Sequence, residues 1–273
     1  MAAVSKSIVI VDFKRSLVPV QWGESVRTVG MSECREAALS LAHAFAADDL
    51  HRYLVDADDS TEKPLSPEDK WKLHVDIMTY IVAAHCCNGV VSTIGPDYEG
   101  VALWLPPGKN LDGWLTTIRS GMWRLYFQLS AEGRKRYYDE MMPLLHHTKA
   151  EVLGDRDDDC YYLVYLGTKP SGRGRGYARK LLEEMIARAD SEGRPMYLES
   201  SSLANVALYT KFGFEVKRDI FLERGPVPVQ LSIMVREPQA RGRKPAAAAA
   251  AAAYPAARAG AGKLQAGAGM KLA

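Results

Sequence analysis

The sequence predicts a mixed α/β fold with strands and helices around one sheet. Two segments carry this prediction. Tyr161 to Leu166 is a short apolar run that ends in a glycine-rich turn, and an amphipathic helix follows at once. Met196 to Leu198 is a second apolar run, followed by a Ser-rich turn and a short helix that ends at Gly213. A chain of 273 residues can bury one core with appendages, or two small domains.

The first elements are expected as follows. Residues 1–24 form an N-terminal extension, in which Ser7 to Phe13 is a candidate strand. Val26 to Val29 is the predicted first strand of the core. Ser32 is a suitable N-cap for the helix that follows, and residues 46–55 continue as a short helix or a loop.

A strong helix start lies at Ser66, because Pro67 occupies the first helical position and two acids follow it. This helix ends at Asn88-Gly89. The next two segments, Val90 to Ile94 and Gly100 to Leu105, predict a β-hairpin.

Residues 109–150 are helical in pattern and form an insertion between strands, with Ser130 as the candidate cap of a second helix. The insertion is expected to cover a substrate pocket, the sheet, or both. Its aromatic stripe is predicted to pack in the core rather than to line a ligand cage; the stripe consists of Trp114, Trp123, Tyr126 and Phe127.

The last part of the chain contains a predicted antiparallel strand pair, Glu215 to Asp219 and Val229 to Val235. Residues 238–273 form an Ala-rich basic tail without a periodic apolar face. We expect this tail to be disordered.

Composition limits the class of protein. No run of 18 apolar residues occurs, which predicts no transmembrane helix, and residues 1–16 do not resemble a secretory signal. The four cysteines show no metal-binding spacing, and we expect no metal. A reduced, cytoplasmic protein fits this cysteine usage best.

The charge distribution argues against nucleic acid as the main partner. Of 35 Lys and Arg residues, six lie after Glu237, which leaves 29 basic against 33 acidic residues before that point. The body of the protein is therefore mildly acidic, whereas binding to phosphate backbones requires a basic surface. We also expect no membrane partner. The oligomeric state cannot be read from the sequence.

The segment from Gly172 to Gly176 reads GRGRG, and its position between a strand and a helix predicts a phosphate site. The dinucleotide fingerprint does not fit, because Tyr177 occupies the place of its third glycine. The P-loop pattern fails because no Gly-Lys-Ser/Thr follows. An RGRG tract on a solvated or RNA-binding loop is the bland alternative, and the flanking strand and helix disfavour it.

A third loop pattern does fit: Arg or Gln, two residues, Gly, one residue, then Gly or Ala. Here it runs from Arg173 to Ala178. This is the pyrophosphate loop of the GCN5-related N-acetyltransferase (GNAT) superfamily, which the chain resembles over roughly residues 25–237. The family's second motif matches at Asn205, Tyr209, Phe212, Gly213 and Phe214.

Within the superfamily, the chain resembles puromycin N-acetyltransferase-like small-molecule acetyltransferases. The shared residues are Tyr161-Tyr162-Leu163 and Leu198-Glu199-Ser200-Ser201. The resemblance implies a central mixed, mostly antiparallel, splayed sheet flanked by helices. It also implies acetyl-CoA as cosubstrate and a small-molecule amine as acceptor.

The resemblance further implies where acetyl-CoA is held. Backbone groups of Leu166, Gly167 and Thr168 would bind the pantetheine amides, and Asn205 would hydrogen-bond the same arm. The pyrophosphate would lie on the loop; its residues are Arg173, Gly174, Arg175, Gly176, Tyr177 and Ala178.

Tyr209 is the candidate general acid for the departing thiolate. The base is open. Several relatives carry a Glu on the strand before the loop, but no acid lies between Tyr161 and Thr168. Glu199 is one candidate, with a turn-capping role as its alternative; His146 or His147 is another, and a water chain is the third. Possible acceptor contacts, if they are not simply a solvated loop, are Asp48, Asp49 and Tyr53.

Other functions stay open. The same fold could transfer another acyl group, use a hydroxyl acceptor, or modify a protein N-terminus or lysine. A different class is a non-catalytic acyl-CoA sensor or interaction module that uses the basic tail.

Overall fold

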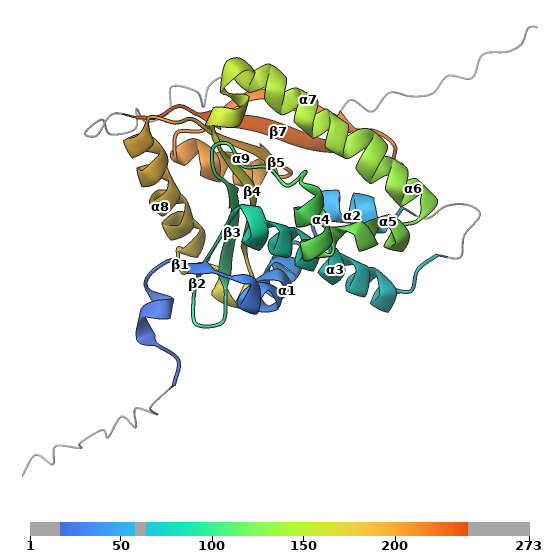
Figure 1. Ribbon diagram of the computed structural model, residues 1–273, viewed down its shortest axis with the longest axis horizontal. Coiled ribbons are helices and arrows are strands. Elements are labelled where there is room, and N and C mark those ends of the chain that lie inside the picture. Colours follow the sequence, from blue (N-terminus) through green and yellow to red (C-terminus); the bar gives the residue numbers. More distant parts are fainter. Residues whose placement is uncertain (1–16, 58–63, 240–273) are drawn as a thin grey trace, which may run out of the picture.

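The computed structural model describes residues 17–57 and 64–239, in which seven strands form one sheet (Figure 1). The strand order is β1-β2-β3-β4-β5-β7-β6. β4 and β5 are parallel, and the other neighbours are antiparallel. The predicted mixed, mostly antiparallel sheet is therefore confirmed. The strands are β1 (Arg27–Val29), β2 (Val90–Ile94), β3 (Gly100–Leu105), β4 (Tyr161–Thr168), β5 (Met196–Ser200), β6 (Glu215–Leu222) and β7 (Val229–Arg236).

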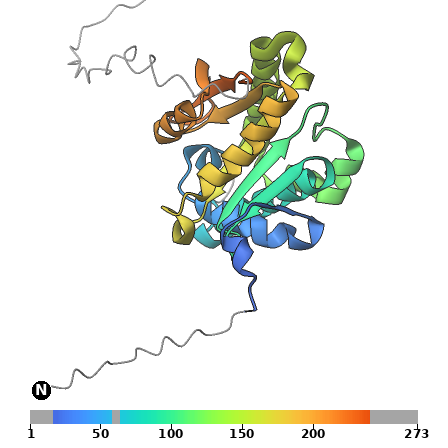
Figure 2. The same ribbon diagram turned by 90° about the vertical axis from the view of Figure 1, so that its left-hand side faces the viewer.

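Helices cover both faces of this sheet. The front face carries α8 (Tyr177–Glu192) and α9 (Leu203–Lys211), and Figure 2 shows α8 lying across it. The rear face carries α1 (Cys34–Ala44), α2 (Asp49–Val55) and α3 (Pro67–Asn88). Short 3-10 turns connect several elements; they are Val20–Gly23, Met31–Glu33, Met122–Arg124, Gly154–Asp159 and Pro170–Gly172.

Local sequence explains the start of α3 but not that of α1. The Ser66 side chain accepts a hydrogen bond from the Asp69 N–H at 3.1 Å, and Pro67 begins α3 as expected. The predicted cap at Ser32 is wrong. That residue lies inside a 3-10 turn, and α1 begins one residue after Glu33 without a side-chain cap.

The core has two layers, one on each face. In α8 the predicted apolar stripe is buried, and Leu181 and Leu182 are almost fully enclosed against the sheet. Burial of each such side chain stabilises the fold by about 1.5–3 kcal/mol. This packing holds the N-terminus of α8 at the end of β4.

The insertion between β3 and β4 is helical, as predicted, and packs against the rear-face helices. Ser130 caps its second part by accepting a hydrogen bond from the Gly133 N–H at 3.0 Å. The elements are α4 (Trp114–Ser120), α5 (Leu125–Gln128), α6 (Ala131–Arg134), a π-helical segment (Lys135–Met141) and α7 (Met142–Leu153).

The predicted burial of the aromatic stripe in this insertion is wrong. The exposed fractions of Trp114 and Phe127 are 70% and 74%, and Trp123 and Tyr126 are exposed as well. The reason is Gly121, whose φ of 79° ends α4 and turns the chain, so that one continuous helical face never forms.

Two sequence-based expectations fall outside the described residues. The candidate strand from Ser7 to Phe13 lies in residues 1–16, which are outside the described ranges. The tail expected to be disordered lies outside them from residue 240 onward. The four cysteines are free thiols. None of the helices in the described ranges is long and apolar enough to cross a membrane.

Candidate active site

The sheet opens between its two central parallel strands. β4 and β5 pair at only three positions, and Leu163 opposite Leu198 is the last of them. Beyond that pair β4 continues for five residues bonded to β3 alone. The backbone N–H and C=O groups along one edge of this part of β4 therefore have no strand partner. Buried backbone groups of this kind normally form a hydrogen bond, here to a ligand or to water.

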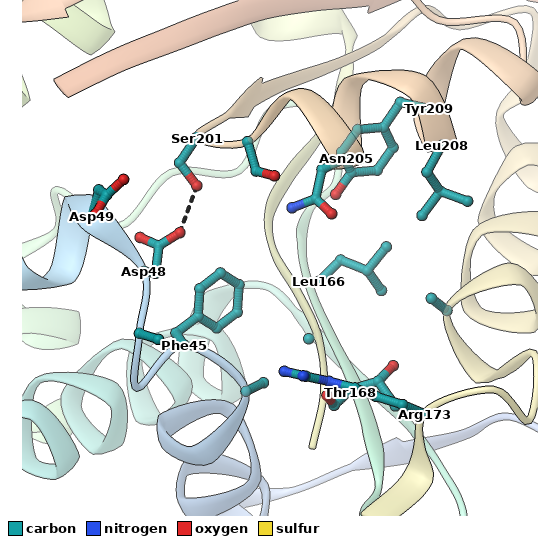
Figure 3. Close-up of a pocket in the computed structure, with 15 residues that line it drawn as sticks. Phe45, Asp48, Asp49, Leu166, Thr168, Arg173, Ser201, Asn205, Leu208 and Tyr209 are labelled. Carbon is teal, nitrogen blue, oxygen red and sulfur yellow. Dashed lines mark hydrogen bonds between the residues drawn. The ribbon is translucent and has the colours of Figure 1, made fainter. Parts of the chain in front are cut away.

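A groove of about 470 Å³ lies along this open edge. Figure 3 shows Asn205 and Leu208 of α9 facing Leu166 of β4 across it. Seven of the predicted catalytic and cofactor-binding residues line this one groove: Leu166, Gly167, Thr168, Arg173, Ala178, Asn205 and Tyr209. Of the possible acceptor contacts, Asp48 and Asp49 line it and Tyr53 does not.

The glycine-rich loop stands at one end of the groove. Gly174 and Gly176 have φ angles of 79° and 75°, which L side chains rarely adopt. Gly176 is also the N-cap of α8, and no side chain caps the first N–H groups of that helix. Those amides are therefore free to bind an anion, and exposed Arg173 adds a full charge.

Two predicted loop residues do not line the groove with their side chains. Arg175 is exposed in the loop, and Tyr177 is buried in the front-face core with an exposed fraction of 5%. Tyr177 can thus contribute only its backbone. Its side chain anchors the first turn of α8.

The other end of the groove is closed by a carboxylate. Asp48 Oδ1 accepts hydrogen bonds from the N–H groups of Leu50 and His51, which caps α2. Asp48 Oδ2 accepts a hydrogen bond from Ser201 Oγ at 2.6 Å (Figure 3). Burial raises the pKa of Asp48, against the opposing hydrogen bonds.

α1 approaches β4 most closely at Gly167. A Cβ atom there would lie 2.8 Å from Leu41 Cδ2 and 2.9 Å from Ala44 Cβ. A glycine is thus required for the packing of α1, which brings the end of α1 and Phe45 to the wall of the groove.

Tyr209 is buried on the groove wall, with an exposed fraction of 7%, and its ring contacts Phe214. Burial raises the pKa of its phenol. The group stays protonated at neutral pH and is available as a hydrogen-bond donor.

Glu199 is the first residue after the last β4–β5 pair, and strand alternation puts it on the same face as Tyr197, opposite to Tyr209. Like His146, it does not line the groove, but it lies directly at the opening between β4 and β5. Its Oε1 atom is buried and has no hydrogen-bond partner in the described part of the chain. Burial raises the pKa of Glu199 to about 7, although the phenols of Tyr162 and Tyr197 act in the opposite direction. A carboxylate with such a pKa is poised for proton transfer near neutral pH.

The second predicted base does not join these groups. His146 is exposed on α7, and its side chain does not line the groove. His147 is exposed too and pairs with Glu151 on the surface. The described residues hold no group of three or more His, Cys, Asp or Glu side chains suited to an ion.

The sequence named Ser201 only as part of a family motif and not as the partner of Asp48, and it did not single out the groove residue Phe45. The signal for Asp48 was present: it precedes a short helix, as capping residues do. Its second bond joins positions 153 residues apart, which no local pattern records.

Comparison with known proteins agrees with this geometry. Residues 145–214 match the model of the acetyltransferase (GNAT) family. An uncharacterised N-acetyltransferase of Schizosaccharomyces pombe is 41% identical over 219 residues, which cover 80% of this chain and 85% of that protein.

The chain belongs to the GNAT family of acetyltransferases. The matched segment of this GNAT protein contains β4, the glycine-rich loop, α8, β5 and α9, which build the groove except for the side formed by residues 44–49. The superfamily resemblance inferred from the loop and Tyr209 motifs is confirmed.

Solved structures of acetyltransferases are also similar to this GNAT chain. One from Corynebacterium glutamicum is 19% identical with a TM-score of 0.49, and covers 80% of this chain and 98% of that chain. Arylalkylamine N-acetyltransferase 2 of Aedes aegypti is 16% identical with a TM-score of 0.49, and the match covers 78% of this chain and 98% of that chain. A polyamine N-acetyltransferase of Drosophila melanogaster is 15% identical with a TM-score of 0.45, and the match covers 78% of this chain and 98% of that chain.

Proposed function

We propose that this acetyltransferase transfers the acetyl group of acetyl-CoA to the amine of a small molecule, by direct attack of the amine on the thioester. The observation that carries the proposal is the convergence of Tyr209, Asn205 and the open edge of β4 on one groove that ends at an uncapped helix N-terminus.

The residues present fit acetyl-CoA. The amides of Gly174 to Ala178 and the charge of Arg173 would hold the pyrophosphate, since helix N-termini favour anions. The unpaired backbone of Leu166 to Thr168 and the Asn205 amide would hold the pantetheine arm. A β4 N–H group at the opening would polarise the thioester carbonyl.

Glu199 would remove the proton that keeps the amine from attacking. Moving a proton from an amine of pKa near 10.4 to a carboxylate of pKa about 7 costs about 5 kcal/mol, against about 8 kcal/mol for an ordinary glutamate. The raised pKa of Glu199 thus makes a neutral amine accessible at moderate cost.

The bond changes balance with two side chains. Glu199 accepts the ammonium proton, the amine nitrogen bonds to the thioester carbon, and the carbon–sulfur bond breaks. Tyr209 supplies a proton to the departing sulfur. The second proton, which the nitrogen loses as it becomes an amide, restores the Tyr209 phenol through solvent, and the first proton leaves Glu199 for solvent. Because burial raises the pKa of this phenol above that of a thiol, Tyr209 acts mainly as a hydrogen-bond donor until the sulfur carries most of its charge.

The direct test is release of free coenzyme A during incubation with acetyl-CoA and a panel of small amines, with mass spectrometry of the products. Turnover that requires an amine supports the proposal. Binding of acetyl-CoA without turnover, unchanged in Tyr209→Phe, would indicate the non-catalytic sensor instead. Acetylation of peptides but not of free amines would indicate a protein acetyltransferase.

The free thiols of Cys34, Cys86, Cys87 and Cys160 favour a reducing compartment, and we place the enzyme in the cytoplasm.

A further inference from the structure

Three tyrosines of β4 and β5 share the rear face of the sheet with Glu199: Tyr162, Tyr165 and Tyr197. The rings of Tyr162 and Tyr197 meet edge-on with their centroids 5.3 Å apart, and both phenols act on the pKa of Glu199. The charge of Glu199 in turn reaches Tyr165. Together Tyr162, Tyr165 and Tyr197 form an aromatic wall. Phe45 extends this wall, because its ring lies 5.3 Å from that of Tyr165 and also borders the groove.

This aromatic wall is open to solvent in part. Tyr162, Tyr165 and Glu199 lie on the two central strands and under helices, yet each keeps some accessible surface. Tyr197 is fully buried, and its hydroxyl, like Glu199 Oε1, lacks a partner among the described residues. Buried polar atoms of this kind are normally satisfied in the functioning protein, by water or by a ligand.

The other acids around this wall are already engaged. Asp48 accepts three hydrogen bonds, two from backbone N–H groups and one from Ser201. Glu140 accepts hydrogen bonds from Tyr53 and from the backbone N–H groups of Glu223 and Arg224. Of these three acids, Glu199 is the one with a buried carboxylate oxygen that has no hydrogen-bond partner among the described residues.

The nearby cations are engaged as well. Lys149, whose Nζ lies 5.9 Å from the centre of the Tyr162 ring, donates hydrogen bonds to Asp157. Arg136 donates to the Tyr53 carbonyl at 2.8 Å and pairs with Glu132. An acceptor with its own carboxylate would thus face Glu199 without a free cation to balance its charge.

We propose that the acetyl acceptor is a monoamine with an apolar body of aromatic size, which places its ammonium group beside Glu199 and its body against Tyr162 and Tyr165. This inference rests on the function proposed above and names the substrate class of the same site. One free carboxylate matches one positive charge, and aromatic faces attract both a cation and an apolar body. A diamine would leave its second charge desolvated and unpaired.

The test compares matched amines. Phenethylamine is measured against putrescine, which has a second charge, and against phenylalanine, which adds a carboxylate to the same body. We expect kcat/KM for phenethylamine to exceed that for either by at least about a hundredfold, the size expected when a buried charge is left unpaired. A preference for putrescine or phenylalanine would overturn the monoamine proposal and leave the acetyltransferase proposal intact. If none of the amines tested were acetylated, both the monoamine proposal and the acetyltransferase proposal would be overturned.

Tyr165→Leu tests the aromatic wall, with Tyr161→Phe as its matched control. Tyr161 lies on the same strand, but its hydroxyl donates to Glu192 on the front face at 2.7 Å. We expect Tyr165→Leu to raise KM for phenethylamine about tenfold with the KM for acetyl-CoA unchanged. Equal effects of the two variants, or no effect of Tyr165→Leu in a folded protein, would contradict the proposed wall.

Discussion

Asp48 and Ser201 are joined by a hydrogen bond of 2.6 Å that fastens the start of α2 to the turn between β5 and α9. The bond closes one end of the groove, and both residues line it. The same carboxylate caps α2, so a single side chain sets the position of two segments that border the site.

Asp48→Ala should lower the free energy of unfolding by about 1–3 kcal/mol, because it removes the cap and leaves Ser201 without its acceptor. Asp48→Asn keeps the oxygen that caps α2, and its amide NH2 can donate to Ser201 Oγ in place of the bond that Ser201 donates to Asp48, so stability should change by less than about 0.5 kcal/mol. Urea unfolding of the two variants checks this. Equal losses would show that the charge, and not the cap, carries the effect.

Glu199→Gln should lower kcat by about 10²–10⁴-fold, since the amide cannot accept the amine proton. In the wild type, kcat/KM should rise with pH and level off above about 7, the pKa of Glu199. The variant should lose this limb. If His146→Ala abolished the limb and Glu199→Gln kept it, the assignment of the base would be wrong.

Glu199 should also cost stability at neutral pH. Its folded pKa of about 7 lies above the ordinary value of 4.5, so its contribution is favourable below pH 4.5 and is lost as pH rises toward 7. The loss amounts to about 3 kcal/mol at most. Glu199→Gln should therefore raise the Tm at pH 8 and leave it nearly unchanged at pH 5; a lower Tm at pH 8 would contradict the burial argument.

Tyr209→Phe should lower kcat about 10- to 100-fold and leave the KM for acetyl-CoA within about twofold, because the ring still packs on Phe214 while the proton for sulfur is gone. Steady-state kinetics with the best amine of the panel measure both constants. A change confined to KM would mean that the phenol only binds the cofactor.

Arg173→Gln should weaken acetyl-CoA binding about three- to tenfold, and the difference from wild type should shrink at high salt because Arg173 is exposed. Arg179→Gln is the control, since Arg179 is an exposed arginine of α8 that pairs with Glu183. Isothermal titration at two salt concentrations distinguishes the two arginines. Equal losses of acetyl-CoA affinity in both variants would mean that Arg173 contributes no more to binding than any exposed arginine of this region.

Local sequence patterns predicted the strands, the loop and the two helices that build the groove. They succeeded because glycines, caps and apolar periodicity act within a few residues. The aromatic stripe at Trp114 and Phe127 failed for the converse reason: its spacing suits one helix, but Gly121 breaks that helix, and only tertiary structure shows which side each part presents.

The surroundings of Glu199 could not be predicted either. Its neighbours Tyr162 and Tyr165 come from another strand, and their side of the sheet depends on the β3–β4 register, which shifts between Leu103 and Trp104. The sequence named Glu199 as a candidate base. The structure adds its raised pKa and its aromatic surroundings.

A crystal structure of the complex with acetyl-CoA tests the central claim most directly. The account predicts pyrophosphate oxygens within about 2.7–3.2 Å of backbone nitrogens between Gly174 and Ala178, with the sulfur beside Tyr209 Oη. A complex in which the nucleotide bound elsewhere and left the groove between β4 and α9 empty would contradict it.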